Sequence, residues 1–279
     1  MPATEFTSTT LSLADGQPCR VWCAGDGPGL LFVHGLPGLA TDFLPLARLL
    51  AEEFFCVLLD RPGYGGSVPL KSGRIVGVAQ NATDVLDVAT QLDLQRLSLV
   101  GWSYGGPIVA QAASNAPRQV DRLVFLGAAG PAMRWPLNLA DRLLYHSGLG
   151  SALVKMLGRM GQGYLRRQLE VAVGAPVGDQ LFAAFLSGLA QPDTVNTWMK
   201  EGAQWAPGET EVSAVQQPSL VIHGDRDRRV DHSVGRDLAA RLVDASFVSI
   251  AGAGHWPFVT HTDEVLARMR DFLVTKEGC

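Results

Sequence analysis

The stretch best suited to chemistry is residues 101–105, Gly-Trp-Ser-Tyr-Gly. An apolar run at residues 97–100 precedes it and predicts a buried strand, and residues 107–113 predict a helix. A serine between glycines at such a tight turn is held in a strained backbone, with its hydroxyl at the edge of a sheet. The N–H groups that begin the helix favour negative charge there. Ser103 is therefore a candidate nucleophile, and the alternative is a serine that only caps the helix.

A serine needs a base within hydrogen-bond reach, and that base needs an acid to orient it. His255 is the best candidate base, because it lies in a glycine-rich loop after the apolar run 246–250. Asp227 is the best candidate acid, in the loop after the run 219–222. The chain order serine, aspartate, histidine is expected when the nucleophile follows the middle strand of a sheet.

Short apolar or alternating segments predict the strands that position these residues. The first two form an antiparallel start around a turn at 14–17, and the others alternate with helices, which is typical of a parallel sheet covered on both faces. Helices are expected from Thr41, as N-cap, to about residue 50, and at 78–92, 233–242 and 262–274. The predicted strands are 7–13, 20–22, 30–33, 54–59, 97–100, 120–126, 219–222 and 246–250.

The alternation stops between residues 131 and 214, where the chain is helical in character and rich in aromatic residues. We expect residues 1–130 and 215–279 to form the core domain and residues 131–214 to form an inserted helical cap. A cap set over a pocket contributes some of its side chains to the lining, although most pack in the cap itself. The candidate pocket residues are Trp135, His146 and Trp198 in the cap, with Trp102 and Trp256 beside the serine and the histidine.

The composition of the chain limits which kinds of partner and which cellular location we expect. The 279 residues have a net charge of −4 and no long basic run, which argues against nucleic acid and anionic membranes. No stretch is apolar for long enough to span a bilayer, and the first residues do not resemble a signal peptide. The four cysteines show no metal-binding spacing. We expect a cytoplasmic protein with a small-molecule substrate, no cofactor and no metal, as a monomer or a homodimer.

Taken together, five motifs resemble the α/β-hydrolase fold superfamily, within its cap-bearing group of esterase-like, dehalogenase-like and epoxide-hydrolase-like enzymes. The resemblance implies an α/β fold with a mostly parallel eight-stranded sheet, flanking helices and an inserted helical cap. It covers nearly the whole chain outside the cap. The motifs are His34-Gly35 with Pro37, residues 60–67 (DRPGYGGS), residues 101–106 (GWSYGG), residues 223–230 (HGDRDRRV) and residues 254–257 (GHWP).

The resemblance also implies an oxyanion hole formed by the backbone N–H groups of Leu36 and Tyr104. The family pattern G-x-x-D-x-x-V places the acid at Asp227. Three other aspartates compete with it. Asp225 is suited to bonding the N–H groups of its own turn, Asp231 to capping the next helix, and Asp141 lies after the preceding strand, a position that some of these folds use.

Ser103 stands where the dehalogenases and epoxide hydrolases of this fold place aspartate, which favours acyl chemistry. We therefore expect a carboxylic ester hydrolase that cleaves a largely apolar small molecule through an acyl-enzyme on Ser103. Activity should fall at low pH as His255 protonates, with an imidazole pKa of about 6.5. Metals and cofactors are not required by this chemistry.

Three alternatives remain. One is a carbon–carbon bond hydrolase of a ring-cleavage dienoate, whose carboxylate Arg134, Arg166 or Arg167 could bind. Another is a cofactor-free haloperoxidase or perhydrolase activity, because the residues around Ser103 also resemble that branch. The third is a ligand receptor on the same fold. Outside the predicted site, Asp60 and Arg61 are expected only to stabilise their turn.

Overall fold

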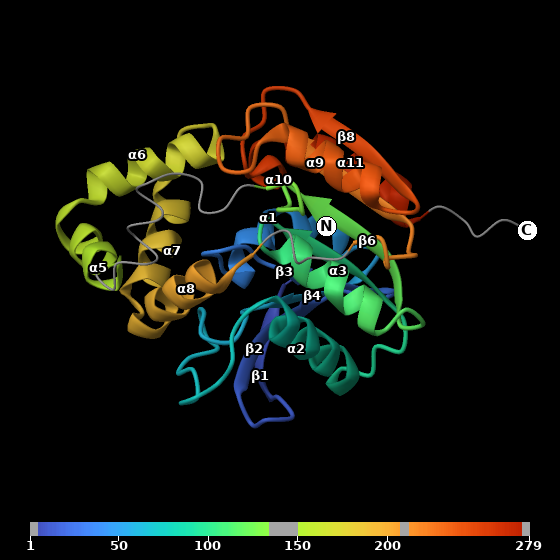
Figure 1. Cartoon of the computed structure of the whole chain (residues 1–279), viewed down its shortest axis with the longest axis horizontal. Coiled ribbons are helices and arrows are strands. Elements are labelled where there is room, and N and C mark those ends of the chain that lie inside the picture. The colour runs from blue at the N-terminus through green and yellow to red at the C-terminus, as the bar shows by residue number, and fades with distance from the viewer. Residues whose placement is uncertain (1–4, 134–149, 207–211, 275–279) are drawn as a thin grey trace, which may run out of the picture.

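The structure is a computed structural model that describes residues 5–133, 150–206 and 212–274. Within these residues eight strands form one sheet in the order β1-β2-β4-β3-β5-β6-β7-β8 (Figure 1). The nucleophile strand β5 lies in the middle of this order, as the sequence predicts. The strands are β1 (Thr7–Ser12), β2 (Pro18–Ala24), β3 (Gly29–Val33), β4 (Phe55–Leu59), β5 (Leu97–Trp102), β6 (Val120–Leu126), β7 (Ser219–Gly224) and β8 (Ala245–Ile250).

The predicted mostly parallel sheet is confirmed. Strands β1 and β2 pair antiparallel, as do β2 and β4. From β4 through β3, β5, β6 and β7 to β8, every neighbouring pair is parallel. Strand β2 is longer than the predicted segment 20–22, because it pairs along its length with β1 on one side and with β4 on the other. The carboxyl ends of β3, β5, β7 and β8 therefore share one edge of the sheet.

Helices cover both faces of the sheet, because the strand side chains alternate between two apolar clusters. One cluster joins Leu30 and Phe32 of β3 to α1, α10 and α11. The other joins Leu31 and Val33 of the same strand to α2, α3 and α9. The helices of the core are α1 (Leu44–Leu50), α2 (Val78–Gln91), α3 (Gly105–Asn115), α9 (His232–Arg241), α10 (Pro257–Thr260) and α11 (Thr262–Leu273).

The predicted N-cap at Thr41 is wrong. A 3-10 turn, η1 (Ala40–Phe43), precedes α1, so Thr41 lies inside a turn that begins earlier. Two carboxylates explain the earlier start: Asp42 Oδ2 accepts the backbone N–H of Leu39 at 2.8 Å, and Asp60 Oδ1 accepts that of Ala40 at 2.8 Å. The second of these acceptors comes from another loop, so the local pattern does not reveal it.

In the part of the chain that the structure describes, four helices follow β6 before the sheet resumes at β7, and Figure 1 shows them beside the carboxyl edge of the sheet. We call them the inserted helices. The helical character predicted for this region holds for its described residues, whereas the boundaries 131 and 214 of a separate cap stay a prediction. No helix in the described ranges is long and apolar enough to cross a membrane. The inserted helices are α5 (Gly150–Met160), α6 (Gln162–Val173), α7 (Asp179–Ala190) and α8 (Pro192–Gln204).

Candidate active site

Ser103 occupies the strained turn between β5 and α3. Its φ is 54°, in the left-handed region that side chains other than glycine rarely adopt. The flanking glycines are required by space, since a Cβ on Gly101 would lie 2.6 Å from the Gly105 carbonyl oxygen and a Cβ on Gly105 would clash with the Val33 carbonyl. The turn thus holds a half-buried Ser103 hydroxyl at the start of α3.

Three side chains from distant loops form one hydrogen-bonded chain at the carboxyl edge of the sheet. Ser103 Oγ lies 2.9 Å from His255 Nε2, and His255 Nδ1 lies 2.7 Å from Asp227 Oδ2. The other oxygen of Asp227 accepts the backbone N–H groups of Arg229 at 2.7 Å and Val230 at 2.9 Å. The carboxylate is therefore fixed by its own loop and oriented toward the imidazole, which is the geometry that serine activation needs.

The environment of Asp227 keeps its carboxylate ionised. Burial alone would raise the pKa of Asp227, but the charge of His255 and the hydrogen bonds from His223 and His255 outweigh it, so the pKa lies well below its ordinary value. His223 Nε2 lies 3.3 Å from Asp227 Oδ2 and 2.9 Å from the Val230 carbonyl. His223 thus contacts the same carboxylate oxygen that faces His255.

The structure separates Asp227 from two of its competitors. Asp225 Oδ1 accepts the backbone N–H of Gly252 at 2.7 Å, which stabilises the turn as expected. Asp231 accepts the backbone N–H of Ser233 at 2.9 Å and caps α9. Neither bonds His255. Asp141 lies outside the described residues.

The loop after β3 brings Leu36 beside the nucleophile. A Cβ built on the preceding Gly35 would lie 3.3 Å from Ser103 Oγ, so this loop passes directly against the serine. Tyr104 immediately follows Ser103 and is the N-cap of α3. In the described part of the chain, neither the Leu36 nor the Tyr104 backbone N–H donates to a protein acceptor. Both groups are available to a ligand oxygen.

His34 holds the same loop in a defined protonation state. Its Nε2 accepts the backbone N–H of Arg61 at 3.0 Å, so the hydrogen lies on Nδ1, which donates to the Gly35 carbonyl at 3.0 Å. Burial, reinforced by the charge of Arg61, lowers the pKa of His34 well below its ordinary value. His34 is therefore a neutral, structural imidazole.

Arg61 does more than stabilise its own turn, which is all that the sequence predicts. Its guanidinium donates to the Gly35 carbonyl at 2.8 Å and to both oxygens of Glu201 in α8, at 2.8 and 2.9 Å. Arg61 and Glu201 are almost completely buried. Sequence reasoning missed Glu201, and no local signal marks it, because its partner lies 140 positions away.

The candidate pocket residues have different surroundings. Trp102 is buried, donates from Nε1 to the His255 carbonyl at 2.9 Å and packs edge-on against Trp256, with ring centres 4.6 Å apart. Trp198 is half-buried and packs against the cluster of Val154, Val195 and Met199 in the inserted helices. Trp135 and His146 lie outside the described residues.

A small, mostly apolar cavity lies between the core and the inserted helices. On the core side it is lined by Trp256 and by the loop that follows Leu36, including Leu39 and Asp42. On the other side it is lined by α7 and α8, through Phe185, Gly188 and Thr194. Trp256 follows His255 in the chain and Pro37 follows Leu36, so the cavity lies close to the loops that carry these two residues.

The described residues contain no cluster of three or more His, Cys, Asp or Glu that could hold a metal ion. Cys19, Cys23 and Cys56 are free thiols. Burial raises the pKa of each thiol, to about 12 for Cys19 and Cys56 and to about 11 for Cys23, so all three are protonated at neutral pH. These thiols are unsuited to nucleophilic chemistry.

The chain is similar to known proteins in both sequence and fold. A family model described as the alpha/beta hydrolase fold matches residues 28–262. The chain belongs to this family. It is 30% identical over 270 residues to a pimeloyl-[acyl-carrier protein] methyl ester esterase of Stenotrophomonas maltophilia (strain K279a), with 89% of this chain and 94% of the relative covered.

Two further proteins are similar to this chain. A 2-hydroxy-6-oxononadienedioate/2-hydroxy-6-oxononatrienedioate hydrolase of Cupriavidus pinatubonensis is 27% identical, covering 96% of this chain and 95% of the relative. The solved epoxide hydrolase CorEH superposes with a TM-score of 0.81 over 96% of this chain and 99% of its own, at 19% identity. The relatives support a hydrolase, and the structural neighbour shows the fold.

Proposed function

We propose that the protein is a serine hydrolase that cleaves a carboxylic ester of a largely apolar small molecule through an acyl-enzyme on Ser103. The observation that carries the proposal is the chain of hydrogen bonds from Ser103 Oγ through His255 to Asp227. The 30% identical methyl ester esterase supports it independently. Aspartate at the nucleophile position would favour alkyl transfer, whereas a serine favours acyl transfer.

Catalysis begins when Ser103 Oγ attacks the ester carbonyl and His255 Nε2 takes the hydroxyl proton. Asp227 holds the imidazole so that Nε2 faces the serine, and it stabilises the imidazolium that forms. The Leu36 and Tyr104 N–H groups bind the oxyanion, and the loss of one such donor costs about 10²- to 10³-fold in kcat. Collapse of the intermediate breaks the ester C–O bond, and His255 gives its proton to the departing alcohol.

Deacylation repeats these steps with water as the nucleophile. His255 takes a proton from the water as its oxygen attacks the acyl carbonyl, and the same two N–H groups bind the second oxyanion. Collapse releases the carboxylic acid, and the proton returns from His255 to Ser103 Oγ. Every group needed for both halves belongs to this chain.

The cavity between the core and the inserted helices supports an apolar substrate. Its lining includes Leu39, Phe185 and Trp256, which offer hydrophobic contact to one part of the ester. We propose that the inserted helices act as a cap that sets the size of the acyl or alcohol group. The expected small-molecule partner and the cytoplasmic location stay predictions.

Hydrolysis of p-nitrophenyl esters of increasing acyl length tests the proposal, with wild type and Ser103→Ala compared at each length. We expect turnover that is highest at one length and a loss of at least about 10⁴-fold in the variant. Equal rates in the two proteins would remove Ser103 from the reaction. Tight binding of a ligand without turnover would favour the receptor alternative.

A carbon–carbon hydrolase is the second candidate, because the Cupriavidus relative is named as the hydrolase of a dienedioate. The described residues give it less support. Arg166 donates to the Val177 carbonyl and to Asp179 in its own region, and Arg167 is exposed, while Arg134 lies outside the described residues. Loss of the colour of a dienoate substrate, measured beside the ester series, distinguishes the two reactions.

A further inference from the structure

Arg61 lies behind the proposed oxyanion hole, and this inference rests on the proposed function. The Gly35 carbonyl and the Leu36 N–H belong to the same planar peptide unit. Arg61 donates to that carbonyl at 2.8 Å, and His34 Nδ1 donates to it at 3.0 Å. Two donors on the oxygen fix the plane of the peptide, so they also fix the direction of the N–H at its other end.

The same guanidinium contacts the second arm of the hole. Its carbon lies 5.2 Å from the centre of the Tyr104 ring and 4.5 Å from that of Tyr64. Both rings are buried, and a guanidinium over an aromatic face is attractive at this range. Arg61 thus contacts both arms of the proposed hole. It bonds the Gly35 carbonyl, which shares a peptide unit with the Leu36 N–H, and it lies over the ring of Tyr104.

Glu201 in α8 makes a charge in this position tolerable. A buried cation without a partner is strongly unfavourable. Glu201 accepts two hydrogen bonds from Arg61, one from Tyr64 Oη at 2.6 Å and one from Asn81 Nδ2 at 2.7 Å. Burial alone would lower the pKa of Arg61, but the charge of Glu201 raises it above the ordinary value. The carboxylate is fully satisfied only when α8 is seated on the core.

We propose that Arg61 is a positioning residue for the oxyanion hole and that Glu201, from the inserted helices, completes it. Seating α8 places the carboxylate on Arg61, and Arg61 in turn holds the Gly35–Leu36 peptide in its donating orientation. The cap thereby contributes to the geometry of catalysis as well as to the shape of the pocket. A purely structural ion pair would stabilise the fold without affecting the reactivity of Ser103.

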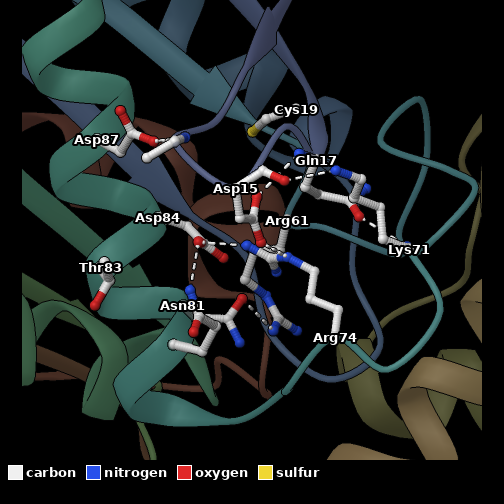
Figure 2. A network of polar contacts seen from close by, with 12 residues as sticks. Asp15, Gln17, Cys19, Arg61, Lys71, Arg74, Asn81, Thr83, Asp84 and Asp87 are labelled. Atoms are coloured by element: carbon white, nitrogen blue, oxygen red, sulfur yellow. Dashed lines mark hydrogen bonds and ion pairs between the residues drawn. The ribbon is translucent and has the colours of Figure 1, made fainter.

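A neighbouring ion pair offers a matched control. Arg74 pairs with Asp84 of α2 at 2.6 Å, and the two side chains are 5% and 4% exposed. Asp84 lies on the same helix as Asn81, Arg74 comes from the loop before that helix, and Figure 2 shows the pair close to Arg61. Arg74 also bonds Asp15, and neither Arg74 nor Asp84 bonds the loop after β3. Its removal changes buried charge near Arg61 without touching Gly35.

The test measures how fast a p-nitrophenyl alkylphosphonate modifies Ser103. The serine oxygen bonds to phosphorus, nitrophenolate leaves, His255 accepts the serine proton, and the P=O oxygen occupies the oxyanion hole. The main variant combines Arg61→Met with Glu201→Met, because exchanging both partners of a buried ion pair for apolar side chains often preserves stability. The control combines Arg74→Met with Asp84→Leu. Thermal unfolding and the kcat and KM for an ester are measured in parallel.

We expect the Arg61/Glu201 double variant to unfold within about 5 °C of wild type and to be phosphonylated about 10- to 100-fold more slowly. Ester hydrolysis should lose kcat by a similar factor with KM nearly unchanged, because an interaction made only in the transition state is weakened. The control should react within about 3-fold of wild type. A double variant that is phosphonylated at the wild-type rate would overturn the inference.

Arg61→Lys keeps the inference testable if the double variant does not fold. Its single ammonium keeps the charge beside Glu201 but lacks the fork that reaches both Glu201 and Gly35. We expect this variant to fold and to be phosphonylated about 10-fold more slowly than wild type, and an unchanged rate would contradict the proposal. Wild-type protein that is not modified at Ser103 would instead overturn the proposed function, and the inference with it.

Discussion

The strand-end loops of the core and the inserted helices differ in what restrains them. In the core, Ser103 follows β5 in a strained turn, and Asp227 follows β7 and accepts two backbone N–H groups. His255 follows β8, accepts a hydrogen bond from Trp102 at its carbonyl and donates its backbone N–H to the Ala172 carbonyl of α6 at 2.9 Å. Among the described residues of the inserted helices, the separate apolar cluster has three buried members, and large side chains such as Tyr164 are more than half exposed. We infer that the strand-end loops set the chemistry, and that the inserted helices can vary more freely except where they bond those loops.

Glu201 is one exception to this division of roles, and the Ala172 carbonyl of α6, which accepts the backbone N–H of His255, is another. Glu201 belongs to the inserted helices by position but to the core by contact, because Arg61, Tyr64 and Asn81 all bond it. If the division were complete, no residue of α5 to α8 would influence the reactivity of Ser103. Substitutions in each region therefore test whether the core alone sets the rate and whether the inserted helices alone set substrate selectivity.

Disabling the core without touching the inserted helices should have the largest effect. Asp227→Asn places an amide where the imidazole needs a carboxylate, so His255 is held in the wrong tautomer. We expect a fall in kcat of about 10³- to 10⁴-fold with little change in KM. Asp225→Asn is the control, because its exposed side chain bonds only a neighbouring turn. Comparable losses in the two variants would remove the distinction drawn between these aspartates.

The boundary between the two regions should set part of the pH dependence of stability. Asp42 lines the cavity, and burial raises its pKa from 3.8 to about 7, with nearby Asp60 adding to the shift. Between about pH 4 and pH 7 the folded protein holds this proton and the unfolded chain does not, so stability falls as the pH rises and then levels off.

The variant Asp42→Asn removes this proton, and its stability should lack that slope. The gain over wild type above pH 7 should reach up to about 4 kcal/mol, from about 1.4 kcal/mol per pKa unit. Urea unfolding of both proteins at pH 5, 6, 7 and 8 measures it. Parallel stability curves would show that Asp42 does not titrate in this range.

The inserted helices should control selectivity more than rate. Gly188→Leu fills the cavity from α7, where a Cβ would be in ordinary contact with Leu39. We expect kcat/KM for long acyl esters to fall about 10-fold relative to the acetate, the size of effect that a few methylene groups produce in a pocket. Ala183→Leu, on the exposed side of the same helix, is the control. An equal loss on all esters would mean that the cavity is not a substrate pocket.

The smallest effect is expected at Arg166. Its partner Asp179 is 98% exposed, so this ion pair should contribute less than about 1 kcal/mol to stability. Arg166→Gln should therefore leave ester hydrolysis within about 2-fold of wild type. A tenfold loss on a dienoate substrate, with ester hydrolysis unaffected, would place Arg166 on a substrate carboxylate and revive the carbon–carbon alternative.

Much of the fold is predictable because strands β3 to β7 are buried along most of their length and occur as nearly continuous apolar runs. Strands β5, β7 and β8 end in short loops, so the order of the runs is enough to bring Ser103, Asp227 and His255 to one edge of the sheet. The start of α1 is harder to predict from the sequence. Thr41 has the residue type of a helix cap, but Asp42 and the distant Asp60 begin the turn earlier.

The contribution of Glu201 is not predictable in the same way. A glutamate beside Lys200 in a polar helix has the pattern of a solvated residue, and only tertiary packing brings it to Arg61. Arg61 itself lies in a recognised motif, yet its reach to Gly35 depends on how the two loops cross. A motif that combines a strand end with a tight turn can be recognised within a short stretch of sequence. Two residues that meet across an interface between elements cannot, because their contact depends on tertiary packing.

The proposed reaction requires Ser103 to carry the acyl group. A reaction with a p-nitrophenyl ester, quenched in acid during the first turnover and analysed by intact mass and peptide mapping, detects that group. We expect one acyl group on the peptide that contains Ser103, formed together with a burst of nitrophenolate and absent in Ser103→Ala. Acylation of another residue, or turnover by wild type with no acyl group on Ser103, would show that Ser103 is not the nucleophile.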